Sequence, residues 1–301
     1  MAGNGTKAKF VPRFESPIAQ SASDQELIYT VAEYYHSCLP KNGDALAYLT
    51  KRGLNDSEAI QRFKIGFCDR TLGHRIPNRQ TQAGAEQRAK LDALGILKET
   101  GHESMRGCIT FPVILSEGKA GELYGRRITK GTPENERHWY LKGPHVGVWN
   151  AEAFGASDTI ILCEGIIDAL TFWIAGFRNV TATFGKSGFT DELYQAFIKS
   201  DTKRCYISFD NDSKNDPTDN AAMMAANRLM AQGIECFRIE YPLNANDTNA
   251  YAMMLRDGNG SAHGPLQMLI NKATWLGKKA GGVRPEAGGN TAPKEENPSE
   301  P

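Results

Sequence analysis

The feature that most constrains the fold is an alternation of short apolar runs with helix-like segments after Thr159. The apolar runs are TIILC, NVTATFG, RCYISF and ECFRIEY, and the helix-like segments between them are GIIDALTFWIAG, DELYQAFIKS and NAAMMAANRLMAQG. This alternation is typical of a parallel sheet that is covered by helices. We therefore expect an α/β domain over residues 156–276, made of a parallel sheet with flanking helices.

The preceding part of the chain has a different pattern, in which helices come first and two strands follow. Ser23 and Glu26 form a capping-box pattern, and DALAYLTKRGL and DSEAIQRFKIGF read as further helices. The runs CITFPVIL and ELYGRRI, which the polar SEGKAG separates, are typical of two antiparallel strands. We expect a mixed α+β module over residues 23–155, ahead of the α/β domain.

The two ends of the sequence lack the composition of folded segments. Residues 1–22 and 277–301 are rich in Gly, Pro, Asn and charged residues, so we expect disordered tails. The chain has 35 basic and 35 acidic residues, so its net charge points to neither nucleic acid nor membrane. Because no apolar run is long enough to span a bilayer and no secretory signal is visible, we expect a cytoplasmic protein without membrane contact.

The cysteines are spread along the chain and include no C-x-x-C pair. They are Cys38, Cys68, Cys108, Cys163, Cys205 and Cys236. Several lie inside apolar runs, where a free thiol behaves as a small core residue. A zinc site of the paired-cysteine type is not expected, and reduced thiols fit a cytoplasmic protein.

Acidic residues follow the predicted strands of the α/β domain. Glu164 follows TIILC, Asp210 and Asp212 follow RCYISF, and Asp247 comes shortly after ECFRIEY. Ligands of open parallel sheets bind beyond the carboxyl ends of the strands, so these side chains are expected at one edge. Asp168 lies one helical turn after Glu164 and can face the same crevice. Crowded carboxylates repel one another unless a cation offsets their charge, and their oxygens favour Mg²⁺ or Mn²⁺ over zinc.

Turn formation is the alternative explanation for acidic residues at strand ends. Asp and Asn hydrogen-bond their own backbone in tight loops, and this explanation suits Asp216 in NDPTD. It does not account for Glu164, which directly abuts an apolar run. We therefore predict Glu164, Asp210 and Asp212 as catalytic residues and metal ligands, with Asp168 and Asp247 as further metal ligands.

These acidic motifs resemble those of a known family. The segment CEGIIDAL, followed later by FDND, resembles the Toprim signature of a glutamate and then a D-x-D pair. AGFRNVTATFGKSGFT and YPLNANDTNAYAM resemble the corresponding segments of the bacterial, DnaG-type primases. In the second of these segments Asp247 fits the first acid of the family's pattern, but Asn249 replaces the second acid. This departure raises the question of an altered second metal site.

The N-terminal module also resembles the primase polymerase core. The likeness covers ALAYLTKRGLNDSEAIQRFKIGF and MRGCITFPVILSEGKAGELYGRRI, and extends in all from about Glu26 to about Leu255. It implies that basic residues of this module hold the template and the nascent strand. The basic residues at matching positions are Arg106, Arg126 and Arg127. Taken without the resemblance, GRRITKG is equally compatible with a solvated strand end.

Three further signals concern phosphate and metal binding. In RHWYLKGPHVGVWN, Trp139 stands where the family usually has a lysine, and we expect Lys142 to compensate. FGKS lacks the distant glycine of a P-loop, so an ATPase motor is not expected, although Lys186 is expected to touch phosphate near the crevice. His138 and His145 have no acid or cysteine at ligand spacing and are expected to be surface or packing residues.

The resemblance implies a primase core that makes short RNA on single-stranded DNA from nucleoside triphosphates, with Mg²⁺ or Mn²⁺ at the Toprim acids. The family's zinc-binding and helicase-contacting modules have no counterpart in the sequence. We therefore expect a stand-alone core, of the kind a mobile element carries, that acts with a separately encoded zinc-binding or DNA-binding helper and a replicative helicase. The alternatives are a Toprim nuclease, which would use the same acids for hydrolysis, and a catalytically weak single-stranded DNA-binding module.

Overall fold

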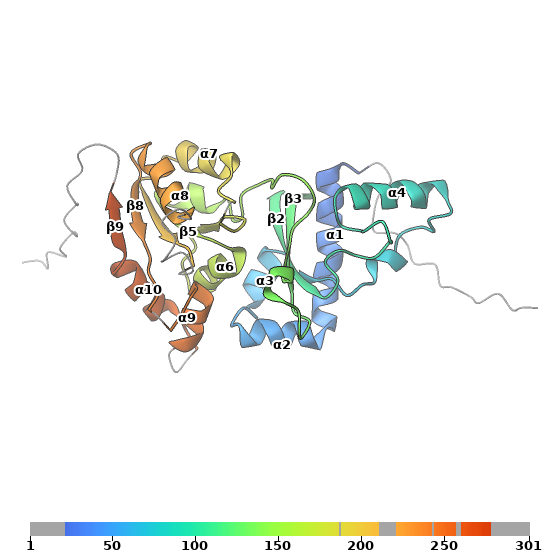
Figure 1. The fold of residues 1–301 in the computed structure, drawn as a ribbon, viewed down its shortest axis with the longest axis horizontal. Coiled ribbons are helices and arrows are strands. Elements are labelled where there is room, and N and C mark those ends of the chain that lie inside the picture. The colour runs from blue at the N-terminus through green and yellow to red at the C-terminus, as the bar shows by residue number, and fades with distance from the viewer. Residues whose placement is uncertain (1–21, 187, 211–220, 243, 257–259, 278–301) are drawn as a thin grey trace, which may run out of the picture.

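Two β-sheets, each with its own helices, lie next to each other along the long axis of the molecule (Figure 1). The computed structural model describes residues 22–277, except 187, 211–220, 243 and 257–259. The first sheet has the strand order β1-β2-β3-β4 and the second the order β6-β5-β7-β8-β9. The predicted combination of a mixed α+β module and a Toprim-type α/β domain is confirmed.

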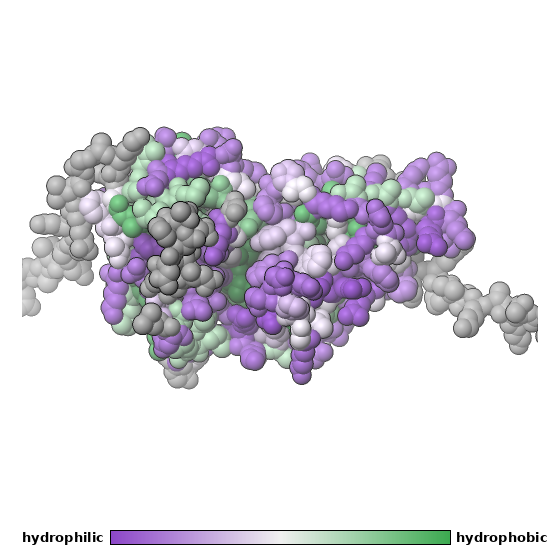
Figure 2. All heavy atoms as spheres, in the orientation of Figure 1, coloured by the Kyte–Doolittle hydropathy of each residue, from purple (hydrophilic) through white to green (hydrophobic). Residues whose placement is uncertain are grey.

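The first sheet is antiparallel and is preceded by helices. Its strands are β1 (Gly66–Phe67), β2 (Cys108–Ser116), β3 (Lys119–Arg127) and β4 (His138–Trp139). Its helices are α1 (Asp24–Cys38), α2 (Gly43–Lys51), α3 (Ser57–Arg62) and α4 (Gln82–Ala93). The predicted strand pair is confirmed, because β2 and β3 pair antiparallel. Figure 2 shows that hydrophilic residues cover most of the visible face of this module.

Local sequence signals account for the helix ends in this module. The Ser23 hydroxyl accepts a hydrogen bond from the backbone of Glu26, and the Glu26 carboxylate accepts one from the backbone of Ser23, which confirms the capping box of α1. After α2 the chain turns at Gly53, where φ is +67° and the Arg256 guanidinium occupies the space of a β-carbon. Glycine adopts this positive φ without strain, and the turn sets the direction from α2 into α3.

The second sheet carries its strands in a mostly parallel arrangement. They are β5 (Thr159–Cys163), β6 (Val180–Ala182), β7 (Arg204–Ser208), β8 (Glu235–Arg238) and β9 (Thr274–Gly277). The helices are α5 (Ala153–Ala156), α6 (Ile166–Ile174), α7 (Asp191–Lys199), α8 (Ala221–Met230), α9 (Thr248–Met254) and α10 (His263–Asn271). Four strands are parallel, as predicted, and β9 adds an antiparallel edge that the sequence did not indicate.

An apolar core joins the two sheets. Phe63, at the end of α3, stacks on Trp149 with ring centroids 4.4 Å apart and meets Trp173 of α6 edge-on at 5.1 Å. These three rings belong to one buried cluster that also contains Phe111 of β2 and Ile161 of β5. Because this cluster spans both modules, packing holds the first module against the second.

Within the ranges described above, no helix has both the length and the apolar composition needed to cross a membrane.

Candidate active site

A pocket of about 180 Å³ lies between the two modules and collects most of the predicted acids. Its lining includes the acids Glu134, Glu164, Asp168, Asp210 and Asp247, the cations Arg52 and Arg126, and the rings of Tyr124, His138 and Tyr140. Carboxylates from the second module thus face cations from the first module across one cavity.

The topology of the second sheet explains how four of the predicted acids converge. Glu164 follows β5, Asp210 follows β7, and Asp168 lies in the first turn of α6. Asp247 is the N-cap of α9, where its carboxylate accepts a hydrogen bond from the backbone of Ala250. The expected gathering at the carboxyl edge is found for these four residues. Asp212 lies outside the described residues.

Hydrogen bonds tie the acid-bearing loops to one another. The Glu164 carboxylate accepts a hydrogen bond of 3.2 Å from the backbone N–H of Asp210. Arg238 at the end of β8 donates to the carbonyl oxygens of Phe209, at 2.8 Å, and of Asp210, at 3.2 Å. The loop after β7 is therefore held from both neighbouring strands.

The surroundings of Asp168 oppose the ionisation of its carboxyl group. Burial, followed by the charges of Asp247 and Asp210, raises the pKa of Asp168 well above its usual value, and the charge of Glu164 adds to this. The backbone N–H of Asn249, 3.1 Å from Oδ1 of Asp168, lowers that pKa and offsets part of the effect. A carboxyl whose pKa is raised by neighbouring carboxylates lies in an environment that a divalent cation stabilises.

The chemistry of the donors fits Mg²⁺ or Mn²⁺, since the four acids offer only oxygen ligands. In the part of the chain that the structure describes, no three His, Cys, Asp or Glu side chains stand close enough to form a ready-made metal site. The described acids thus share a pocket without converging on a single point. The metal role of these residues remains a prediction.

Arg126 is the most firmly held cation of the pocket. Its side chain is 7% exposed, and it donates to Glu134 at 2.9 Å and to Nε2 of His138. Nδ1 of His138 lies 3.0 Å from the hydroxyl of Tyr124. Burial, and then the charge of Arg126, lowers the pKa of His138, which favours the neutral ring that can accept from Arg126.

Sequence reasoning missed Arg52, the second cation of the pocket. Arg52 is the C-cap of α2, and its guanidinium lies 5.7 Å from the ring centroid of Tyr48. The available signal was a basic residue directly before Gly53, in a segment that resembles the opening of the primase core.

The structure places the other predicted basic residues away from the acids. Arg127 lies over the ring of Trp139 at 4.6 Å and donates to the carbonyl of Ser104, on the opposite side of β3 from Arg126. Arg106 lines a separate hollow of about 420 Å³ together with Arg70 and Arg88.

The two predicted lysines are exposed. Lys142 pairs with Asp92 at 2.9 Å and does not line the acid pocket. Lys186 lies next to Gly185, which lines that pocket. Of the predicted basic residues, Arg126 therefore faces the acids and Lys186 lies near them.

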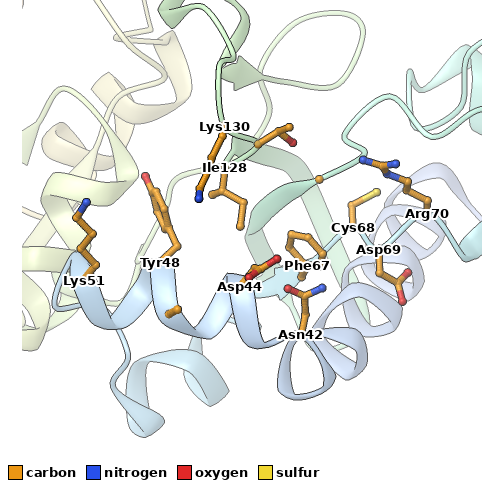
Figure 3. A pocket seen from close by; sticks show the side chains of 13 residues that line it. Asn42, Asp44, Tyr48, Lys51, Phe67, Cys68, Asp69, Arg70, Ile128 and Lys130 are labelled. Carbon is orange, nitrogen blue, oxygen red and sulfur yellow. The ribbon is translucent and has the colours of Figure 1, made fainter.

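A larger groove of about 820 Å³ adjoins the same face of the first module. Its lining includes Tyr48, Phe67 and Ile128 as apolar contacts, and Lys51, Arg70 and Lys130 as cations. In Figure 3, Tyr48 and Lys51 project from α2 toward the side on which Lys130 lies. Tyr48 precedes Arg52 by one helical turn and Ile128 follows Arg126 by two residues, so the groove is lined from segments that also contribute to the acid pocket.

Comparison with known protein families agrees with this architecture. A family model described as the N-terminal domain of the DNA primase catalytic core matches residues 34–152, and a Toprim-like model matches residues 161–252. The two stretches together account for more than half of the chain. The chain belongs to the DnaG primase family. The predicted resemblance is thereby confirmed for both modules.

Curated relatives of this DnaG-type core are named DNA primase. The protein of Haemophilus influenzae is 29% identical over 199 residues, which is 62% of this chain and 32% of that protein. A Staphylococcus aureus protein is 26% identical over 252 residues, which is 76% of this chain and 40% of that protein. The chain thus spans well under half the length of these relatives.

Solved DnaG structures share the fold. A structure of the Aquifex aeolicus primase, with zinc-binding and RNA polymerase domains, has a TM-score of 0.65 at 22% identity and covers 85% of this chain and 63% of its own. A DNA primase domain from Pseudomonas aeruginosa has a TM-score of 0.66 at 21% identity, covering 84% and 80%. A DnaG catalytic domain bound to single-stranded DNA has a TM-score of 0.65 at 20% identity, covering 84% and 82%.

Proposed function

We propose that this chain is a primase core that joins ribonucleotides into short RNA on single-stranded DNA. The observation that carries the proposal is the pocket in which Glu164, Asp168, Asp210 and Asp247 face Arg52 and Arg126. Nucleotidyl transfer brings together a negatively charged triphosphate and the end of a growing strand. A cavity with carboxylates on one wall and guanidinium groups on the other suits a metal-bound triphosphate.

Divalent metal would be held on the side of the pocket that carries the carboxylates, which we call the acid wall. The residues proposed as ligands are Glu164, Asp168, Asp210, Asp212 and Asp247. Bound Mg²⁺ or Mn²⁺ would neutralise phosphate charge and stabilise the attacking and leaving oxygens of an in-line displacement. The contribution of the chain itself is to orient these carboxylates, through Arg238 and the Glu164–Asp210 contact.

The opposite side of the pocket, which carries Arg52 and Arg126 and which we call the basic wall, would bind the phosphates of the nucleotide directly. Arg126 is held in place by Glu134 and His138, so it can present its remaining N–H groups without a large loss of side-chain entropy. Arg52 offers a second guanidinium from the end of α2. Lys186 is proposed as an exposed third cation beside the pocket.

The larger groove supports a path for nucleic acid away from the acids. Its cations, Lys51, Arg70 and Lys130, can contact a phosphate backbone, while Tyr48 offers an aromatic ring on which a base can stack. Arg106 and Arg127 lie outside the pocket, so their proposed role is limited to outlying contacts with the template.

We further propose that the chain acts in the cytoplasm with a separately encoded zinc-binding or DNA-binding helper and with a replicative helicase. The Aquifex structure contains a zinc-binding domain besides its RNA polymerase domain, and the proposed helper would supply that part to this core. The core alone is then expected to extend an annealed primer more readily than it starts a chain, because initiation must order two free nucleotides.

A single assay tests the proposed activity. Single-stranded DNA carrying an annealed RNA primer is incubated with labelled nucleoside triphosphates and Mg²⁺ or Mn²⁺, and the products are scored for both extension and template cleavage. We expect extension by the wild-type chain and none by Asp210→Ala. Cleavage without extension would identify a nuclease instead, and DNA binding with neither reaction would identify a binding module.

A further inference from the structure

Asn249 connects the two modules at the edge of the acid pocket. It lies in α9 of the second module, is 1% exposed, and contacts Arg52 of the first module through its side chain. Arg52 and Asp168 both line the pocket, and Asn249 is hydrogen-bonded to both of them. One buried residue therefore contacts a cation and a carboxylate of the same cavity.

Both polar atoms of the Asn249 side chain are hydrogen-bonded. Oδ1 accepts from Nη1 of Arg52 at 3.0 Å. Nδ2 donates to the carbonyl oxygen of Arg52 and to Oγ1 of Thr171, both at 2.9 Å. The main-chain N–H is used as well, because it donates to Oδ1 of Asp168 at 3.1 Å.

These partners call for an amide at position 249. One atom must accept from a guanidinium while the other donates to a carbonyl oxygen, and only an amide carries both functions in this shape. A carboxylate would still accept from Arg52 Nη1, but its second oxygen would face the Arg52 carbonyl oxygen without a proton between them. A buried polar group that is left without its hydrogen bond lowers the stability of the folded state.

We propose that Asn249 is a positioning residue that aligns Arg52 with Asp168 across the acid pocket, and that it does not serve as a metal ligand. Its side-chain oxygen is engaged by Arg52, so it acts on bound phosphate through that guanidinium. It acts on the acid wall through its main-chain N–H, which fixes one oxygen of Asp168. This inference rests on the proposed function only for the nature of the ligands, a nucleoside triphosphate and a divalent cation.

The test measures binding of two probes by calorimetry: Mn²⁺ alone, and ATP in the presence of Mg²⁺. For Asn249→Ala we expect an ATP affinity about tenfold or more below that of the wild type, the size expected when a hydrogen bond to a charged group is removed. The double variant Asn249→Ala/Arg52→Ala should bind ATP no more weakly than Arg52→Ala alone, because the effect of Asn249 passes through Arg52. Independent, multiplicative losses would overturn the proposal.

Asn249→Asp separates positioning from metal ligation. We expect weaker Mn²⁺ binding in this variant even though it adds an acid to the pocket edge, because the new carboxylate disturbs Arg52 and the α9 backbone that holds Asp168. Tighter Mn²⁺ binding would show that position 249 is a ligand position and would overturn the proposal. Asn271→Asp, the same change at an exposed site on α10, controls for the added charge and should bind both probes as the wild type does.

If the Asn249 variants do not fold, Thr171→Val tests the same proposal through a partner of Asn249. Valine has nearly the shape of threonine but removes one acceptor of Nδ2. We expect a smaller but measurable loss of ATP affinity, and an unchanged affinity would overturn the proposal. A wild-type chain that bound neither probe would instead remove the proposed function, and this inference with it.

Discussion

The carboxylate of Glu122 accepts a hydrogen bond of 2.7 Å from Nδ1 of His145. Glu122 is 2% exposed on β3, and it also accepts from the backbone N–H groups of Leu123 and Leu141. A buried carboxylate is tolerated when its oxygens are satisfied in this way. His145 therefore supplies the one side-chain donor in this network.

The ring of His145 also contacts a residue close to the acid pocket. It stacks on Phe184 with ring centroids 4.5 Å apart and an interplanar angle of 13°. The next residue, Gly185, donates its backbone N–H to the carbonyl oxygen of Glu164 at 3.0 Å. The Glu122–His145 pair thus links the first sheet to the loop that borders a predicted catalytic residue.

His145→Ala should lower the free energy of unfolding by about 2 kcal/mol, because it leaves the buried Glu122 carboxylate without a side-chain donor. Urea denaturation followed by circular dichroism measures this difference. His102→Ala, at an exposed histidine, is the matched control and should stay within about 0.5 kcal/mol of the wild type. Equal losses in the two variants would show that the His145 contact contributes no stability of its own.

Asp210→Ala should abolish primer extension while leaving the melting temperature in metal-free buffer unchanged or slightly higher. Removing one member of a set of mutually repelling carboxylates relieves repulsion, so the loss is one of function only. Asp212→Ala and Glu164→Gln should behave likewise. Asp191→Ala, which removes an exposed acid on α7, should retain activity. A markedly lower melting temperature for Asp210→Ala would point to a structural role.

The gathering of the acids was predictable because it depends on one topological rule. Once the strands are recognised as parallel, the residues after them must lie at the same edge, and this places Glu164, Asp210 and Asp247 together. The opposite orientations of Arg126 and Arg127 also follow from strand geometry, since neighbouring residues of a strand face opposite sides. The family resemblance instead implied the same role for both arginines, because they share one motif.

Other features could not be predicted because they depend on contacts between distant segments. Asn249 and Arg52 lie 197 positions apart, and no spacing within either segment indicates their contact. Helix α4 was missed because its sequence is mostly polar, with Leu91 as its one large buried apolar side chain. Strand β9 was missed because two helices in succession, α9 and α10, separate it from β8. The regular alternation of strands and helices has ended at that point of the sequence.

Arg126→Ala should weaken binding of a single-stranded oligonucleotide or a triphosphate more than Arg127→Ala does. Only Arg126 faces the acid pocket, whereas Arg127 packs on Trp139. When a variant makes one phosphate interaction fewer with a single strand, the slope of log affinity against log salt decreases by about 0.7. Titrations at several salt concentrations measure both quantities. Equal slopes for the two variants would place the template path away from Arg126.

The contribution of Asp168 to the stability of the metal-free protein should fall as the pH rises above about 4. The folded chain raises the pKa of this carboxyl above its ordinary value of 3.8, so it retains a proton that the unfolded chain releases. When the folded state binds more protons, the free energy of unfolding decreases with rising pH until the raised pKa is passed. Melting temperatures measured in chelator between pH 4 and pH 8 test this direction.

Asp168→Asn isolates this contribution, because the amide cannot ionise. The difference in melting temperature between Asp168→Asn and the wild type should widen in favour of the variant as the pH rises, and Asp191→Asn should show no such trend. Added Mg²⁺ should raise the melting temperature of the wild type more at pH 8 than at pH 5, since the cation stabilises the ionised carboxylates. A wild-type stability that rises with pH relative to Asp168→Asn in chelator would contradict the repulsion assigned to this pocket.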